Sequence, residues 1–399
     1  MAPKLRATDL IHGDALLNRD DRPDVTPPIS VSTTFRVNPD PDAPGYQDDD
    51  PRNPSRHVYS RYTQDISTRA EHVLSKINDG YAMTFASGLA ASYAVMVQYK
   101  PKRLAITGGY WGIYQTVQAY SKAKDEEVKV IDLDAEYEPG DVVWLETPVN
   151  PTGECRDIAY YAEKIHKVGG KLIVDSTLAP PPLQYPFEFG ADCVIHSGTK
   201  YFGGHCDLLC GVVIVKTEAE WKTLLHDRTY MGTMIGSLEA WLLLRSLRTL
   251  HLRIARQSEN ATKLVEWFKL VIENTASGQD YDGVPAGLLT KVLHSSVQGV
   301  DKRGFDPKSQ LKNGWNATFS IHLSDVVYAK NLPCCTQYFL PATSFGGVES
   351  IIGWRARVAP GENPLLVQLS VGCEDFDELK DDLRDAFKKV VEIGKKAKD

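Results

Sequence analysis

The residues best suited to chemistry lie between positions 171 and 211. Asp175 ends the run K-L-I-V-D, and Lys200 ends the run H-S-G-T-K. A lysine amine can form a Schiff base with an aldehyde, and an aspartate can keep a pyridine nitrogen protonated, which makes the ring an electron sink. The hydroxyls of Ser197 and Thr199 can donate to a phosphate. Since pyridoxal 5'-phosphate (PLP) carries all three groups, we predict PLP as the cofactor.

Two short apolar runs, Leu172–Val174 and Cys193–Ile195, precede these residues. Such runs, bounded by turn residues, predict buried strands. Open α/β sheets bind ligands at the carboxyl ends of their strands, so Asp175 and Lys200 are expected to converge on one crevice. The ordinary alternative is a solvent-exposed lysine, but Asp175 and the glycines Gly203–Gly204 favour a cofactor site.

A third part of the site is predicted between the strand Tyr81–Phe85 and the helix Gly88–Tyr99. The turn that joins them reads A-S-G-L. The first turn of a helix presents backbone N–H groups that suit a phosphate. We therefore expect Ser87, Gly88 and Leu89 to form a phosphate cradle.

Other apolar runs alternate with helical patterns, which predicts a mostly parallel sheet with helices on both faces. The further strands expected in this sheet are Leu104–Thr107, Val128–Leu133, Val142–Glu146 and Val212–Val215. We divide the chain into an N-terminal arm at 1–56, a PLP-binding large domain at 57–254 and a small C-terminal domain at 255–399.

The boundary of the small domain is expected after one long interdomain helix, Leu238–Ile254. The segment Gly278–Asn313 is rich in Gly, Asp and Ser and shows little periodicity, so it is expected to be a loop region that carries specificity. Strands are predicted at Ala317–Leu323 and Leu366–Val371, and apolar spacing from Phe376 onwards predicts a final amphipathic helix.

Composition excludes several classes of protein. The 399 residues carry a net charge of −7, which argues against nucleic acid as a partner. No apolar run is long enough to span a membrane, and the N-terminus lacks the apolar core of a secretory signal. The seven scattered cysteines imply no disulfide framework, Cys206 and Cys210 lack a second ligand pair, and no metal site is predicted. We expect a cytoplasmic protein.

Five motifs, spread over nearly the whole chain, resemble those of one known family. They are S-G-T-K-Y-F-G-G-H, Y-S-R (59–61), A-S-G-L-A-A (86–91), E-T-P-V-N-P-T-G (146–153) and F-G-G-V-E-S (345–350). The chain resembles the cystathionine γ-synthase family of Cys/Met-metabolism PLP enzymes, and H-V-Y-S-R-Y-T and W-R-A are most similar to its fungal branch. The resemblance implies an α/β, aminotransferase-like fold (fold type I) with a smaller C-terminal α+β domain.

The resemblance also implies roles for residues that spacing alone leaves open. Lys200 and Tyr110 would be catalytic, with Tyr110 stacked on the PLP ring; a half-buried core tyrosine is the plain alternative. Tyr59 and Arg61 would bind the cofactor phosphate of a neighbouring subunit, although spacing alone favours a surface pair. The resemblance thus implies an arm that wraps the neighbour and a homotetramer built from dimers with shared sites.

On the substrate side, the resemblance implies Asn150, Ser344, Arg355 and Gln368. Asn150 would face the cofactor's phenolic oxygen or the substrate carboxylate. The chain departs from the family at Gln368, where the family has an arginine that grips the α-carboxylate. Glutamine is neutral and offers two donors where a guanidinium offers five. Either Arg355 or Arg357 takes over, or the substrate is unusual or weakly held, or the ancestral activity is lost; we favour the first two.

The function implied is γ-substitution on an O-activated homoserine, such as O-acetyl-L-homoserine, with a sulfur or carbon nucleophile. The departure at Gln368 favours a role in fungal specialised metabolism. Cystathionine β- or γ-lyase activity is the alternative, because it uses the same cofactor residues. A PLP-binding protein without turnover is the further alternative.

Overall fold

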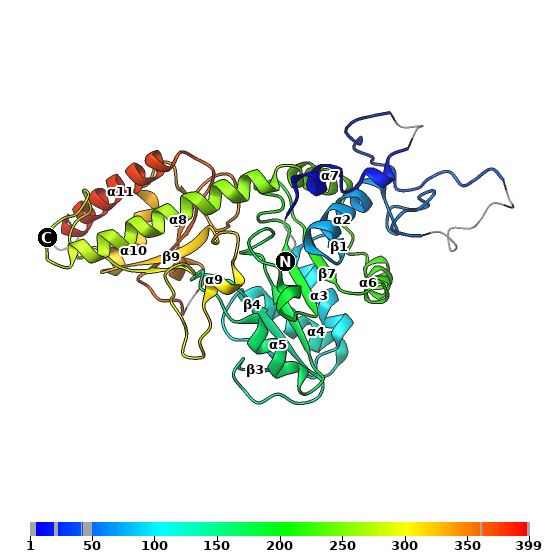
Figure 1. Cartoon of the computed structure of the whole chain (residues 1–399), viewed down its shortest axis with the longest axis horizontal. Coiled ribbons are helices and arrows are strands. Elements are labelled where there is room, and N and C mark those ends of the chain that lie inside the picture. The colour runs from blue at the N-terminus through cyan, green and yellow to red at the C-terminus, as the bar shows by residue number, and fades with distance from the viewer. Residues whose placement is uncertain (1–4, 20–22, 41, 43–49, 360, 397–399) are drawn as a thin grey trace. The chain divides into compact units, whose positions relative to one another are not determined.

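The computed structural model describes residues 5–19, 23–40, 42, 50–359 and 361–396, and Figure 1 labels their elements. These residues form two compact units. The first comprises Met1–Leu145, Ile158–Thr177 and Tyr185–His251. The second comprises Glu146–Asp157, Leu178–Gln184 and Leu252–Asp399. Parts of the predicted arm 1–56 lie outside the described residues.

The first unit alternates strands with helices, as the sequence pattern predicts. Its helices are α1 (Ala7–His12), η1 (Ala15–Leu17), α2 (Asp65–Asn78), α3 (Gly88–Tyr99), α4 (Trp111–Lys124), α5 (Ile158–His166), η3 (Pro186–Phe189), α6 (Glu218–Met231) and α7 (Ser237–Leu247). Its strands are β1 (Tyr81–Phe85), β2 (Arg103–Ala105), β3 (Lys129–Ile131), β4 (Asp141–Glu146), β5 (Lys171–Asp175), β6 (Cys193–Ser197) and β7 (Gly211–Val215).

In the described residues these strands make one sheet in the order β1-β7-β6-β5-β4-β2-β3. β7 runs antiparallel to β1 and β6, whereas β5–β6, β4–β2 and β2–β3 are parallel pairs. The predicted mostly parallel sheet is therefore confirmed. Alternate residues such as Met83 of β1 and Val213 of β7 pack in one core with α3, α4 and α6. The intervening residues, such as Ile214, are buried too, so both faces of the sheet are covered.

The second unit has a sheet in the order β10-β11-β12-β9-β8, in which β10–β11 is parallel and the other pairs are antiparallel. Its strands are β8 (Leu289–Leu293), β9 (Thr318–Leu323), β10 (Leu340–Pro341), β11 (Ile351–Trp354) and β12 (Leu366–Ser370). Its helices are α8 (Leu250–Thr275), α9 (Pro307–Gln310), α10 (Val326–Asn331), η4 (Leu332–Cys334), η5 (Arg355–Arg357) and α11 (Phe376–Lys396). The predicted smaller α+β domain is confirmed.

An aromatic cluster joins the long helices of the second unit to its sheet. The ring of Phe268 on α8 lies 6.2 Å from that of Phe387 on α11 and 6.1 Å from that of Phe319 on β9. All three side chains are fully buried. Edge-to-face contacts of this kind favour one packing of the helices over others.

The loop after β4, residues 146–157, belongs to the second unit, although the sequence division placed it in the large domain. Polar side chains of the second unit bind its backbone: Ser320 Oγ donates to the Pro151 carbonyl at 2.7 Å, and Asn316 Nδ2 donates to that of Gly153 at 3.2 Å. Sequence periodicity carries no signal for such side-chain contacts. The boundaries 56/57 and 254/255 stay predictions.

Two expectations about helices and loops were wrong. The helix predicted at Leu238–Ile254 is two helices, α7 and α8, separated at Arg248 and Thr249, and α8 continues to Thr275. The Thr249 hydroxyl donates to the Ser246 carbonyl at 3.3 Å, a bond that competes with helix continuation. The segment 278–313 contains β8 and α9, which are too short for periodicity to reveal.

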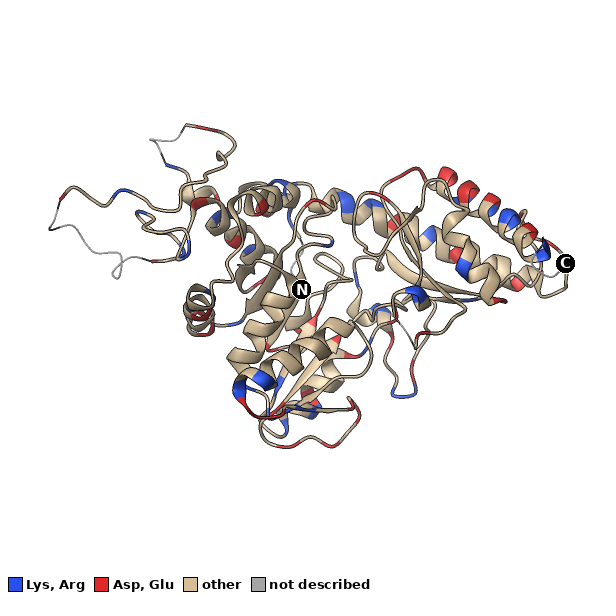
Figure 2. Ribbon diagram, turned by 180° about the vertical axis from the view of Figure 1, so that it is seen from behind, with Lys and Arg blue, Asp and Glu red and all other residues tan. Residues whose placement is uncertain are grey.

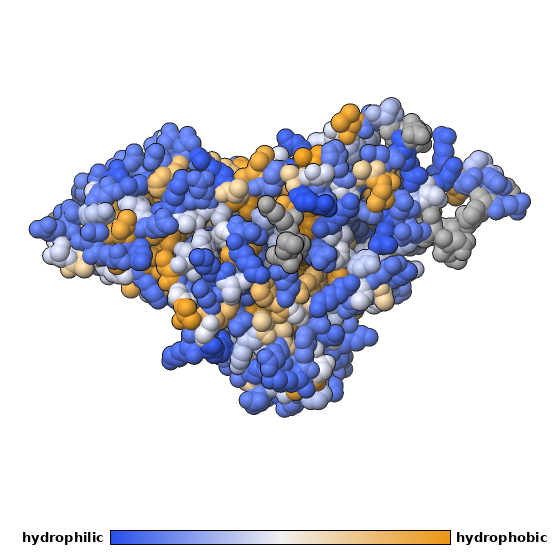
Figure 3. All heavy atoms as spheres, viewed as in Figure 1, coloured by the Kyte–Doolittle hydropathy of each residue, from blue (hydrophilic) through white to orange (hydrophobic). Residues whose placement is uncertain are grey.

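Charged residues of both signs lie along α11 (Figure 2), where Asp381 pairs with Arg384 and Asp385 with Lys388. On the face that Figure 3 presents, hydrophilic residues predominate and apolar residues form small scattered groups. Among the described residues, no helix has the length and apolar character needed to cross a bilayer.

A buried ion pair ties β1 to two helices of the first unit. Arg228 of α6 lies 2.5 Å from the Glu71 carboxylate of α2 and donates to the Thr84 carbonyl of β1 at 3.1 Å. The same Glu71 oxygen accepts hydrogen bonds from the Thr84 N–H and hydroxyl at 3.0 and 2.7 Å. Both charged side chains are buried, so each depends on the other to offset its desolvation.

We predict that Arg228→Met lowers the free energy of unfolding by about 3–5 kcal/mol, because it leaves the Glu71 charge buried and unpaired. The double variant Glu71→Gln/Arg228→Met should recover part of that loss, since it removes both charges. Chemical denaturation followed by circular dichroism measures both effects. A single variant as stable as the double variant would contradict this account.

Candidate active site

Lys200 is held in a tight turn directly after β6. The Lys200 N–H donates to the Ser197 carbonyl at 3.1 Å, and the Lys200 carbonyl accepts from the Gly204 N–H at 2.7 Å. Gly204 has a φ of 69°, which suits glycine and explains the G-G that follows the lysine. Burial lowers the pKa of the Lys200 amine below its usual value. A larger fraction of the amine is therefore neutral, which a nucleophile or base requires.

Asp175 is the last residue of β5, which pairs in parallel with β6. Its Oδ1 accepts from the Thr177 N–H at 3.0 Å and from the Thr177 hydroxyl at 2.5 Å. The Thr177 hydroxyl in turn accepts from the Ser197 N–H at 2.8 Å. Burial raises the pKa of Asp175 to about 6, and the bonds from Thr177 partly oppose that shift. A cation beside this carboxylate would stabilise its charged form.

Ser87, Gly88 and Leu89 lie where the sequence predicts a phosphate cradle. Ser87 caps α3, since its Oγ accepts from the Ala90 N–H at 3.1 Å. A Cβ added to Gly88 would lie 3.3 Å from Ser197 Oγ, so this turn is close to the end of β6. At Gly211, a Cβ would lie 2.2 Å from the Ser87 carbonyl oxygen, so only glycine allows β7 to approach the turn. The helix start and Ser197 therefore share one edge of the sheet.

Tyr110 lies at the same edge, immediately before α4. Tyr110 is 48% exposed and is not part of the buried core. A Cβ on Gly112 would lie 2.4 Å from Tyr110 Cε1 and 3.1 Å from Leu89 Cδ2. The tyrosine ring and Leu89 thus converge above the first turn of α4, within the first unit.

Three residues predicted to bind the phosphate, Thr199, Tyr59 and Arg61, make contacts with other residues of the chain. The Thr199 hydroxyl accepts from the Cys210 N–H at 3.0 Å and donates to the Cys210 carbonyl at 3.3 Å. The Arg61 guanidinium lies 5.5 Å from the centre of the Tyr59 ring. Roles for Thr199, Tyr59 and Arg61 in phosphate binding stay predictions.

Thr177 escaped the sequence analysis, and His196 was placed at the end of its strand without a role. Thr177 links Asp175 to Ser197, and the only signal was a hydroxyl two residues after the aspartate, a common local hydrogen-bonding pattern. His196 precedes Ser197 on β6, is buried, and lies 4.7 Å from the Phe202 ring. Burial lowers the pKa of His196 to about 3, so its ring is neutral at pH 7.

The substrate residues expected by resemblance lie in the second unit. Ser344, Arg355 and Gln368 line one narrow pocket. Gln368 lies on β12, between Gly353 of β11 and Ser320 of β9. Asn150 adjoins the group, because its Oδ1 accepts from Gln368 Nε2 at 2.9 Å. The structure therefore brings these four residues together, within one unit.

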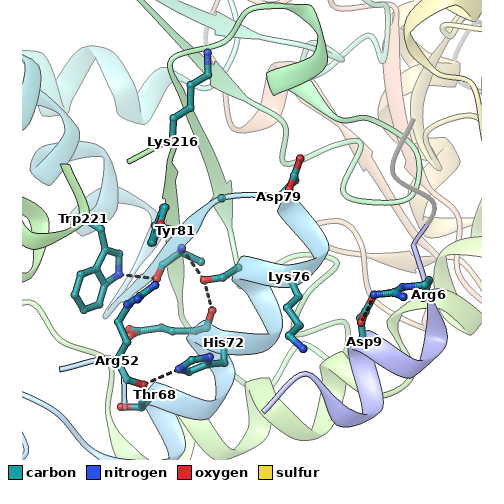
Figure 4. Close-up of a pocket in the computed structure, with 14 residues that line it drawn as sticks. Arg6, Asp9, Arg52, Thr68, His72, Lys76, Asp79, Tyr81, Lys216 and Trp221 are labelled. Atoms are coloured by element: carbon teal, nitrogen blue, oxygen red, sulfur yellow. Dashed lines mark hydrogen bonds and ion pairs between the residues drawn. The ribbon is translucent and has the colours of Figure 1, made fainter. Parts of the chain in front are cut away.

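A larger pocket of about 590 Å³ in the first unit contains none of the predicted site residues (Figure 4). It opens at the start of β1, whereas the phosphate cradle follows the end of that strand. Arg6 in this pocket is paired with Asp9 at 2.7 Å, and the Arg52 guanidinium lies 5.1 Å from the Tyr81 ring. These cations have partners within the chain, so the pocket is not where we place the chemistry.

The first unit fits PLP on its own geometry. Lys200, whose pKa is lowered, suits the aldehyde of PLP. The buried carboxylate of Asp175, which a cation would stabilise, suits the protonated pyridine nitrogen. The start of α3, which lies close to Ser197, suits the phosphate. Within the described part of the chain, no group of three or more His, Cys, Asp or Glu residues could hold a metal ion. The seven cysteines all lie among the described residues, and none of them is joined in a disulfide.

Comparison with known proteins agrees with this geometry. The model of the family described as Cys/Met metabolism PLP-dependent enzyme matches residues 7–388. The cystathionine gamma-synthase/O-acetylhomoserine (thiol)-lyase of Bacillus subtilis (strain 168) is 30% identical over 393 residues, which cover 92% of each chain. The chloroplastic cystathionine beta-lyase of Arabidopsis thaliana is 32% identical over 351 residues, which cover 83% of this chain and 72% of that protein.

Among solved structures, cystathionine gamma-lyase from Lactobacillus plantarum, complexed with L-serine, superposes with a TM-score of 0.81 at 26% identity and covers 96% of this chain and 98% of its own. The fold, the lysine–aspartate geometry and the family match lead to one conclusion. This chain belongs to the family of Cys/Met metabolism PLP-dependent enzymes, and pyridoxal 5'-phosphate is its cofactor.

Proposed function

We propose that the chain catalyses γ-substitution on an O-activated homoserine, O-acetyl-L-homoserine, with a sulfur or carbon nucleophile. The observation that carries the proposal is the placement of Lys200, an amine of lowered pKa, and the buried Asp175 at the ends of the neighbouring parallel strands β6 and β5. The printed name of the Bacillus subtilis relative, which includes O-acetylhomoserine (thiol)-lyase, supports the choice of leaving group.

When bound, PLP supplies an electron sink that acidifies the hydrogens next to the amino group of the substrate. Lys200 would hold the cofactor and, as a free amine, would take the Cα proton of the substrate, because burial favours its neutral form. Asp175 would keep the pyridine nitrogen protonated, and Thr177 fixes the direction of its carboxylate. Tyr110 would pack against the cofactor and offer its hydroxyl for a second proton transfer.

A lyase reaction on cystathionine is the second candidate, and the names of the Arabidopsis and Lactobacillus proteins favour it. It shares the proton removal by Lys200 and differs in the bond that breaks. The two reactions are separated by their products, since a lyase releases ammonia and a 2-oxo acid from cystathionine. Membership of the fungal branch, a role in specialised metabolism and a cytoplasmic location stay predictions.

We propose further that the enzyme is a homotetramer with shared sites. The described part of the N-terminal arm supports this proposal, because it exposes apolar side chains that a single chain leaves uncovered. They are Val25, Ile29, Val31 and Val37. Tyr59 and Arg61 follow directly after this arm, where a neighbouring subunit could use them. Exposed apolar segments of this kind mark contact surfaces.

The reaction predicts acetate release from O-acetyl-L-homoserine by the purified, PLP-loaded protein. Lys200→Ala should lower the rate by at least about 10³-fold, because proton transfer and the covalent hold on the cofactor are lost together. Lys216→Ala is the control for loss of a lysine elsewhere in the unit. Release of ammonia and a 2-oxo acid from cystathionine, with no acetate from the homoserine ester, would favour the lyase instead.

The assembly proposal predicts that Val31→Asp/Val37→Asp dissociates the tetramer into smaller species and lowers activity with them. The physical reason is that a charge cannot replace an apolar contact that is buried between subunits. Light scattering coupled to size exclusion measures the mass, and Asn38→Asp adds a charge to the same arm as a control. A fully active monomer would refute shared sites.

A further inference from the structure

Gln368 has no donor left for a substrate. Its Nε2 donates to Asn150 Oδ1 at 2.9 Å and to the Pro151 carbonyl at 3.2 Å. An amide nitrogen carries two hydrogens, and these two bonds use both. A carboxylate can only accept hydrogen bonds, so Gln368 in this position offers it nothing. The side chain, 7% exposed, instead fixes the turn that carries Asn150.

Arg355 is in the opposite situation in the same pocket. Its Nε is buried and has no hydrogen-bond partner among the described residues. Burial lowers the pKa of the guanidinium, while the charges of Glu362 and Glu146 oppose that shift. A buried N–H without an acceptor is costly, because it has lost its hydrogen bonds to water. An anion that entered the pocket beside Ser344 would supply the missing acceptor.

We propose that Arg355 binds the α-carboxylate of the amino-acid substrate, and that Gln368 is a positioning residue for Asn150. A guanidinium presents parallel N–H groups that match a carboxylate in a fork geometry. Arg357, two residues on in η5, is exposed and does not line the pocket, so the structure separates two arginines that the sequence could not. The inference rests on the proposed function only in taking an α-amino acid as substrate.

The test compares two ligands that differ only in the carboxylate, L-norvaline and n-butylamine. Binding of each to the PLP-loaded protein is followed by the change in cofactor absorbance, which needs no turnover. Arg355→Gln should raise the Kd for L-norvaline about 10- to 100-fold, as expected for loss of a charged hydrogen bond. The Kd for n-butylamine should not change, because butylamine has no group for Arg355 to bind.

Arg357→Gln is the matched control, and it should leave both dissociation constants as they are in the unmodified protein. An unchanged ratio in Arg355→Gln, or a ratio lost in Arg357→Gln, overturns the assignment. Failure of the γ-substitution proposal is a separate result: acetate release would be absent although the ratio still depends on Arg355.

Discussion

The first unit depends on a carboxylate buried at the end of a strand. Asp175 is the last residue of β5 and is largely removed from water. This burial raises its pKa to about 6. Thr177 limits that cost by donating two hydrogen bonds to the carboxylate, and its hydroxyl accepts a third from the Ser197 N–H. These hydrogen bonds connect the aspartate to Ser197, the residue that begins the turn of Lys200.

In each unit, one cationic side chain of the candidate site has a pKa that partial burial lowers. In the first unit this is Lys200, for which a lowered pKa favours the neutral amine and hence covalent chemistry. In the second it is Arg355, which stays charged in practice and can only be stabilised by an anion. Burial therefore favours covalent chemistry at Lys200 and anion binding at Arg355.

Much of the first unit followed from the sequence, because strand ends are visible in it. Short apolar runs placed Asp175 and Lys200 at the carboxyl edge, and the A-S-G-L turn placed Ser87 at a helix start. The role of Thr177 did not follow, since a hydroxyl near an aspartate is common in turns. The sequence also did not show that Gln368 donates to Asn150, or that the helix breaks before α8. Both features depend on side-chain hydrogen bonds, which leave no periodic signal in the sequence.

Borohydride reduction of the PLP-loaded protein shows which lysine holds the cofactor. Reduction makes the link to the amine permanent, so digestion and mass spectrometry can locate it. We expect the cofactor's mass on the peptide that contains Lys200 and on no other lysine. Cofactor fixed at a different lysine, or bound cofactor that reduction cannot fix, would rule out the role of Lys200.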